Sequence, residues 1–189
     1  TVADFTLTTT GVSGASITSV TGSGATRTVG VNTGTGNGTI QLNVVDDDSI
    51  LDGAANRLGG TGAGNGLFTT GQSYTVDKTG PSVVSSVRLN SNPTTRTTVF
   101  FRVTFSENVI GVTAADFSLT APGITGASIT SVTGTGAIRT VGVNTGTGSG
   151  TITLNVLDDD SIMDAATNRL GGTGAGNGDF TTGQTYNVR

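Results

Sequence analysis

The chain has 189 residues, a formal net charge of −4, 31 Gly, and neither Cys nor His. This composition excludes thiol chemistry, imidazole catalysis and zinc sites built from Cys or His. The absence of any basic cluster argues against nucleic-acid binding, and no apolar run approaches the roughly 18 residues that a membrane-spanning helix needs.

The chain carries an internal repeat. Thr1–Asp77 aligns with Thr113–Arg189 at a constant offset of 112 residues, and 59 of the 77 aligned pairs are identical. We therefore expect a partial first domain over 1–77 that lacks its opening strands, and a complete second domain over 78–189. Two explanations for the partial copy stay open. The sequence is a section of a longer tandem array, or strands of a neighbouring molecule complete the first copy.

Short runs of alternating apolar and polar residues predict the strands of the complete copy. The run 99–105 places Val99, Phe101, Val103 and Phe105 on one face. The expected strands are 83–89, 99–105, a short strand with Phe117 and Leu119, 127–133, 138–144, 151–157 and 180–188. About seven strands separated by glycine-rich turns are typical of a β-sandwich. Because Lys and Glu occur once each, we expect almost no helix.

An acidic loop follows one strand in each copy, at 46–56 and 158–168. The two loops hold 8 of the 13 acidic residues. One interpretation is calcium, which takes six to eight oxygen ligands, and the other is a solvated turn whose aspartates accept backbone N–H bonds. The candidate calcium ligands are Asp46, Asp48, Asp52, Asn56, Asp77, Glu107, Asp116, Asp158, Asp160, Asp164 and Asn168. If the loop folds back, Asp158, Asp160, Asp164 and Asn168 converge.

A glycine-rich segment, 171–179, follows the acidic loop. It lacks the Lys and the following helix of a phosphate-binding loop, and Leu67 stands in the first copy where the second has Asp179. We therefore predict a flexible hairpin or Ω-type loop without an essential ligand. Two arginine pairs recur in both copies, Arg27/Arg139 and Arg57/Arg169, and we expect them to pair with the acidic loop of their own domain or of the next one.

Four short motifs occur along the chain: the joint 77–81 (DKTGP), the strand 103–109 (VTFSENV), the segment 115–117 (ADF) and the segment 164–168 (DAATN). Together they resemble the motifs of bacterial immunoglobulin-like, or cadherin-like, tandem repeats. In the last motif Thr167 replaces the usual Gly, and Ala55 stands there in the first copy. The resemblance implies tandem immunoglobulin-like β-sandwich domains of large secreted or cell-surface bacterial proteins, with calcium at loops or joints and no enzymatic activity.

We therefore expect a structural extracellular module, such as an adhesin stalk rigidified by calcium, whose partners are neighbouring repeats or identical subunits. No nucleic acid, membrane insertion or small-molecule substrate is expected. The alternative is a self-assembling filament or sheath subunit that is completed by strand exchange. A carbohydrate-binding sandwich would need exposed aromatic residues, and the chain has no Trp and two Tyr, Tyr74 and Tyr186. Ice binding would need a flat array of Thr, whereas strands of a sandwich twist.

Overall fold

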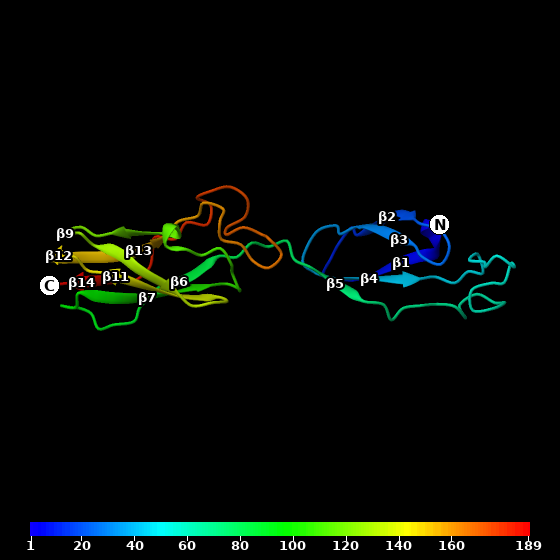
Figure 1. Cartoon of the computed structure of the whole chain (residues 1–189), viewed down its shortest axis with the longest axis horizontal. Coiled ribbons are helices and arrows are strands. Elements are labelled where there is room, and N and C mark those ends of the chain that lie inside the picture. Colours follow the sequence, from blue (N-terminus) through cyan, green and yellow to red (C-terminus); the bar gives the residue numbers. More distant parts are fainter. The chain divides into compact units, whose positions relative to one another are not determined.

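The computed structural model describes all residues, 1–189, and the chain forms two compact units, Thr1–Lys78 and Thr79–Arg189. The fold is all-β, with 44% strand, 3% helix and several antiparallel sheets (Figure 1). The expectation of almost no helix is confirmed, since the helical residues form two single 3₁₀ turns. No helix has the length and apolar character that crossing a membrane requires.

The second unit has two main sheets, one with the order β10-β11-β7-β6 and one with the order β14-β13-β8. A small sheet of β12 and β9 lies apart from them. The elements are β6 (Val83–Arg88), β7 (Thr98–Phe105), η2 (Ala114–Asp116), β8 (Phe117–Thr120), β9 (Ile124–Thr125), β10 (Ser128–Thr133), β11 (Ile138–Asn144), β12 (Thr147–Gly148), β13 (Gly150–Val156) and β14 (Thr185–Val188).

Both main sheets contribute to one apolar core. Along β7, buried and exposed residues alternate, and Val99, Phe101 and Val103 have no exposed surface. They belong to one cluster with Ile152 and Leu154 of β13, which are also fully buried. The period of two in the sequence predicted this face of β7, because successive side chains of a strand point to opposite sides.

The closing strand is shorter than the sequence predicted. Alternation indicated a strand over 180–188, but β14 begins at Thr185. Phe180 forms an isolated bridge with Val156, and the N–H of Gln184 then donates to the carbonyl of Ser86 at 2.9 Å. The segment between them leaves the β13 ladder because its backbone turns to β6 in the other sheet.

The first unit repeats part of this arrangement. Its sheets are β1-β4-β5 and β2-β3, which correspond to β8-β13-β14 and β10-β11. The elements are η1 (Val2–Asp4), β1 (Phe5–Thr10), β2 (Ser16–Thr21), β3 (Thr28–Asn32), β4 (Gly38–Val44) and β5 (Ser73–Val76). No strand of this unit corresponds to β6 or β7. Its buried core is accordingly small and consists of Val12, Ile40 and Val76, with Leu7, Ala15 and Val31 packed against it.

Candidate functional site: the acidic loop and the glycine-rich loop

The acidic loop of the second unit begins directly after β13, and its aspartates are partly buried. Asp158 and Asp164 are only 6% and 2% exposed, Asp160 is half-buried, and Asp159 points to solvent. Burying a carboxylate is costly unless hydrogen bonds replace its hydration. The partners of these carboxylates therefore show what the loop does.

Asp158 ties the acidic loop to the glycine-rich loop. Its Oδ1 accepts the N–H of Asp160 at 3.0 Å, and its Oδ2 accepts the N–H of Gly178 at 3.0 Å. Its main-chain carbonyl accepts the N–H of Gly176 at 2.8 Å. A single residue thus closes its own turn and holds two amides from a segment about 20 residues away.

Asp160 adds a third attachment. Both of its carboxylate oxygens accept the N–H of Gly174, at 3.1 and 3.2 Å, and Oδ2 lies 2.9 Å from Nη1 of Arg169. The prediction that Arg169 pairs with its acidic loop is confirmed. Asp160 has a φ of +69°, a left-handed conformation that Asp tolerates better than most residues. The glycine-rich loop is therefore held at every second amide from Gly174 to Gly178.

Asp164 and Asn168 close a separate turn. Asp164 Oδ1 accepts the N–H of Asn168 at 2.9 Å, and Oδ2 accepts the side-chain amide of Asn168 at 2.8 Å. Between them, Thr167 has a φ of +69°. This left-handed position would suit Gly, because Gly adopts positive φ without a steric penalty.

Asp116 connects the acidic loop to the turn before β8. It is 1% exposed, and its Oδ2 accepts both the N–H and the hydroxyl of Thr113, at 2.5 and 3.0 Å. Its Oδ1 accepts the hydroxyl of Ser161 at 2.7 Å. These donors satisfy a buried carboxylate and fix the start of β8 to the acidic loop.

The first unit reproduces the same bonds. Asp46 accepts the N–H of Gly66 at 2.8 Å, and Asp48 accepts the N–H of Gly62 at 3.2 Å. Asp48 also pairs with Arg57 at 3.0 Å, as the sequence predicted. The Gly66 N–H lowers the pKa of Asp46 below its ordinary value of 3.8.

Further hydrogen bonds lower the pKa values of neighbouring carboxyls. The side chain of Asn56 lowers the pKa of Asp52, and Ser49 lowers that of Asp47. In the second unit, Ser161 lowers the pKa of Asp159. Each of these groups is stabilised in its charged form, as an acceptor of protein hydrogen bonds.

The predicted calcium ligands are only partly brought together. Glu107 and Asp164 place carboxylate oxygens within 4.8 Å of each other. The expected convergence of Asp158, Asp160 and Asp164 is not observed, because no three of these loop carboxylates bring ligand oxygens within that distance. Asp158 and Asp160 instead accept hydrogen bonds from glycine amides, and Asp116 accepts them from Thr113 and Ser161. Asp77 follows β5 at the end of the first unit. In the first unit Asp46, Asp48, Asp52 and Asn56 form the corresponding bonds.

Comparisons with known proteins give no relative for this arrangement. No family model matches the chain, and neither a curated protein nor a solved structure is significantly similar to it. The resemblance to bacterial immunoglobulin-like repeats therefore rests on the sequence motifs alone.

The other arginine pair differs from its prediction. Arg139 was expected to pair with an acidic loop, but its guanidinium donates to the carbonyls of Gly136 at 2.9 Å and Val109 at 2.8 Å. Burial lowers the pKa of Arg139. Arg27 binds the carbonyls of Gly24 and Thr26, just as Arg139 binds those of Gly136 and Ile138, and Arg27 is exposed. The prediction is wrong for this pair because the nearest acceptors are carbonyls of the arginine's own hairpin and of the segment after β7.

The sequence missed the attachment of the glycine-rich loop. The glycine-rich loop and the acidic loop recur at the same offset of 112 residues. Each copy has glycines at the three positions whose N–H groups are bound. The joint recurrence of aspartates and glycines was the available signal. It indicates one structural element in two segments, in which carboxylates serve as acceptors for backbone amides.

Proposed function

We propose that the chain is a structural repeat module of a secreted or cell-surface bacterial protein. Its two units are tandem immunoglobulin-like β-sandwich domains, and their role is to extend and stiffen an array without catalysing a reaction. The observation that carries the proposal is the use of the acidic loop. In both units the densest cluster of ionisable groups binds backbone amides of the same unit, as Asp158 binds Gly178 and Asp46 binds Gly66.

Long glycine-rich loops are costly to order, because glycine loses more backbone entropy on folding than any other residue. Aspartates that hold alternate amides reduce the freedom of the loop in the folded state. A module that transmits force along an array benefits from this, since each repeat contacts mainly its neighbours and stability is local. The exposed and half-buried salt bridges of Asp48 and Asp160 are secondary, because such pairs contribute about 0–1 kcal/mol each.

Single-molecule force spectroscopy of the full chain tests the mechanical role. Unit two contains residues 79–189. If it resists extension, it unfolds in one event that releases roughly 350–400 Å of chain, given about 3.3–3.6 Å per extended residue. Smooth extension without a force peak from this unit would contradict the proposal.

Calcium is a separate part of the proposal, and Glu107 and Asp164 support it because their carboxylate oxygens lie within 4.8 Å. Oxygen ligands of this kind suit Ca²⁺. At 100 times its dissociation constant, a bound ion adds about 2.7 kcal/mol to the free energy of unfolding, which raises the melting midpoint by roughly 10 °C.

Thermal melting with calcium, with magnesium and with a chelator measures this shift. The variant Glu107→Gln is expected to lose it, whereas Asp159→Asn, an exposed change in the same loop, keeps it. Equal midpoints with calcium and chelator would remove calcium from the proposal and leave the mechanical role to the force measurement.

A further inference from the structure

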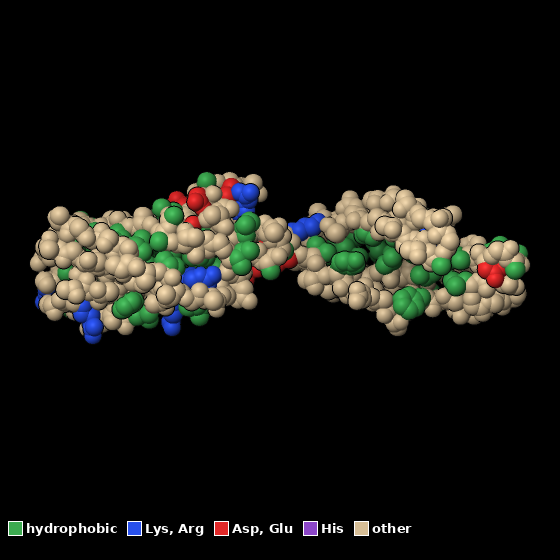
Figure 2. Space-filling model, in the orientation of Figure 1, with side chains coloured by type: hydrophobic (Ala, Val, Ile, Leu, Met, Phe, Trp, Pro, Cys, Tyr) green, Lys and Arg blue, Asp and Glu red, His purple; other side chains and the backbone are tan.

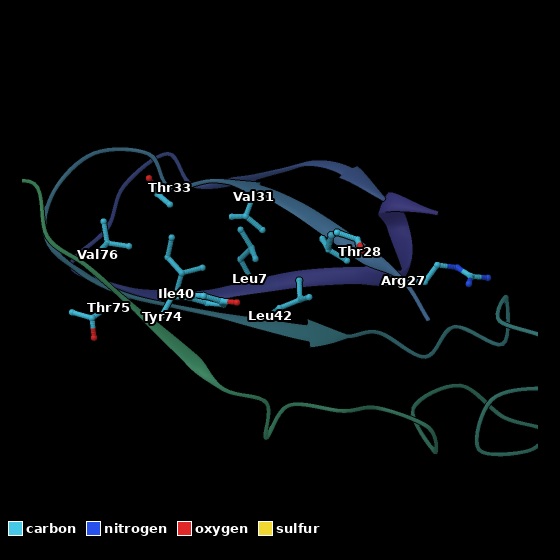
Figure 3. A pocket seen from close by; sticks show the side chains of 11 residues that line it. Leu7, Arg27, Thr28, Val31, Thr33, Ile40, Leu42, Tyr74, Thr75 and Val76 are labelled. Carbon is cyan, nitrogen blue, oxygen red and sulfur yellow. The ribbon is translucent and has the colours of Figure 1, made fainter. Parts of the chain in front are cut away.

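The first unit contains an apolar groove of about 560 Å³ between its two sheets. Figure 2 shows hydrophobic side chains gathered in a hollow of this unit, and Figure 3 shows Leu7, Val31, Ile40 and Leu42 directed into the space. The residues that line it are Leu7, Arg27, Thr28, Val29, Val31, Thr33, Ile40, Leu42, Tyr74, Thr75 and Val76.

The second unit shows what fills the same space. Ten of the eleven lining residues are identical at the offset of 112, the exception being Thr75, which aligns with Asn187. In the second unit, β7 lies against β11 and inserts Val99, Phe101 and Val103 into the core. Val141 and Leu154 are then fully buried, while their counterparts Val29 and Leu42 are only half-buried.

The edge of the groove is an unpaired strand edge. β11 pairs with β10 on one side and β7 on the other, whereas β3 pairs with β2 alone. Phe101 lies opposite Val141, and Val99 lies opposite Val143. The equivalent register in the first unit places a Phe opposite Val29 and a Val opposite Val31. An exposed strand edge beside an apolar groove is a template for strand addition.

Polar side chains around the groove also correspond to side chains that bind the β6–β7 hairpin in the second unit. In the second unit the Tyr186 hydroxyl accepts the N–H of Asn90 at 2.8 Å, and the Gln184 side chain accepts the N–H of Arg88 at 3.0 Å. The first unit has Tyr74 and Gln72 at these positions. Tyr74 is 74% exposed, whereas Tyr186 is fully buried.

Thr145 binds the carbonyl of Arg96, which lies between β6 and β7, at 2.8 Å. Its counterpart in the first unit, Thr33, is exposed. The first unit therefore retains the apolar lining, the strand edge and the polar anchors of a site whose occupant in the second unit is the β6–β7 hairpin.

We infer that the groove of the first unit is the docking site of a second copy of the β6–β7 hairpin, a segment with the sequence pattern of residues 82–105. Exchange of hairpins between two identical 189-residue chains does not fill all of their grooves. Each chain has two such sites and one hairpin, which already occupies its own second unit. Every exchange would therefore empty one groove for each that it fills. The occupant is an additional hairpin of this kind.

A synthetic peptide with the sequence of residues 82–105, added to the full chain, tests this inference. Expected results are one-to-one binding, slower hydrogen exchange of the amides of 27–32, and a shift of the Tyr74 ring signals. The peptide contains two adjacent Phe residues on opposite faces, Phe100 at 37% exposure and Phe101 at 0% in the second unit. A Phe101→Ser peptide is expected to bind about 100-fold more weakly, because a buried aromatic is lost, and a Phe100→Ser peptide to bind nearly as the parent does.

Variants of the chain provide the second measurement. Val29→Asp places a charge in the groove and abolishes peptide binding, while Leu51→Asp, an exposed change outside the groove, leaves it intact. Absence of binding by the parent peptide would overturn the inference, and so would equal binding of the two Phe variants. A groove-dependent dimer of the chain alone that the peptide does not displace would identify a whole second chain as the occupant, and would likewise overturn it.

Discussion

The hydroxyl of Tyr186 donates to the carbonyl oxygen of Phe100 at 2.9 Å and so joins the last strand of the second unit to β7 in the opposite sheet. The same hydroxyl accepts the N–H groups of Leu89 at 3.1 Å and Asn90 at 2.8 Å. The ring meets Phe101 edge-on, with 5.0 Å between the ring centroids. One side chain thus fixes β14, the β6–β7 turn and β7 relative to one another.

The variant Tyr186→Phe is expected to lower the free energy of unfolding of the second unit by about 1–3 kcal/mol, because the change removes the acceptor of the Asn90 N–H and the hydroxyl that donates to Phe100, while the Leu89 N–H keeps the Phe100 carbonyl at 2.9 Å. Tyr74→Phe is the matched control. It lies at the same position of the repeat but is 74% exposed, so its effect is expected to be near zero. Denaturant unfolding of both variants measures the difference, and equal losses would contradict the role assigned to the hydroxyl.

The left-handed turn at Thr167 gives a stabilising substitution. A β-branched residue at a φ of +69° is strained by about 1–2 kcal/mol. Part of the gain from Thr167→Gly is offset by the greater freedom of Gly in the unfolded chain, so we expect a net increase of about 0.5–1 kcal/mol. Its neighbour Ala166 has no positive φ, and Ala166→Gly is expected to lower stability by a similar amount. Thermal melting compares the two, and a loss of stability in both would contradict the strain at Thr167.

Much of the fold was predictable, because strand period and repeat offset are local signals. The strand 138–144 was predicted with the bounds that β11 has, and the inward face of β7 followed from alternation. The end of the chain was less well predicted. β14 is shortened because Gln184 bonds to Ser86, a residue 98 positions earlier, and alternation carries no information about such a contact.

The candidate site was predicted in composition rather than in geometry. The acidic loop was found from its charge density, and turn shaping by its aspartates was one of the two interpretations that the sequence left open. The recurrence of aspartates and glycines at one offset indicated that the two segments belong together, but which amides donate was not predictable, because an N–H group is present at every non-proline residue. Arg139 was assigned to the wrong acceptor for the same reason, since its partners are main-chain carbonyls.

The attachment of the glycine-rich loop is testable one bond at a time. In Asp158→Asn, an amide replaces one of the two oxygens that accept backbone N–H groups. The loss of a charged acceptor costs about 1.5–3 kcal/mol, so hydrogen exchange at Gly178 is expected to accelerate by about 10–100-fold. Asp159→Asn is the control, because the exposed Asp159 accepts the N–H of Ser161 within its own turn. Unchanged exchange at Gly178 in the Asp158 variant would contradict the attachment.

Acid is expected to destabilise the chain through the same carboxyls. Hydrogen bonds hold the pKa values of Asp46, Asp47, Asp52 and Asp159 below the ordinary 3.8, which we take for the unfolded chain. A lowered pKa means that the folded state favours the charged form. Its contribution to stability is therefore complete above the unfolded pKa and is lost as the pH falls through the lower, folded pKa.

The melting midpoint is expected to stay level from about pH 7 to about pH 5 and to fall below about pH 4. Asp52→Asn removes one of the titrating groups, so its midpoint at neutral pH is lower and its decline in acid is shallower. Melting curves of the parent chain and of this variant, recorded at constant ionic strength, measure both effects. A midpoint that rises as the pH falls from 4 to 2 would contradict this expectation. It would show that repulsion among the charged aspartates destabilises the fold more than their hydrogen bonds stabilise it, because protonation removes that repulsion.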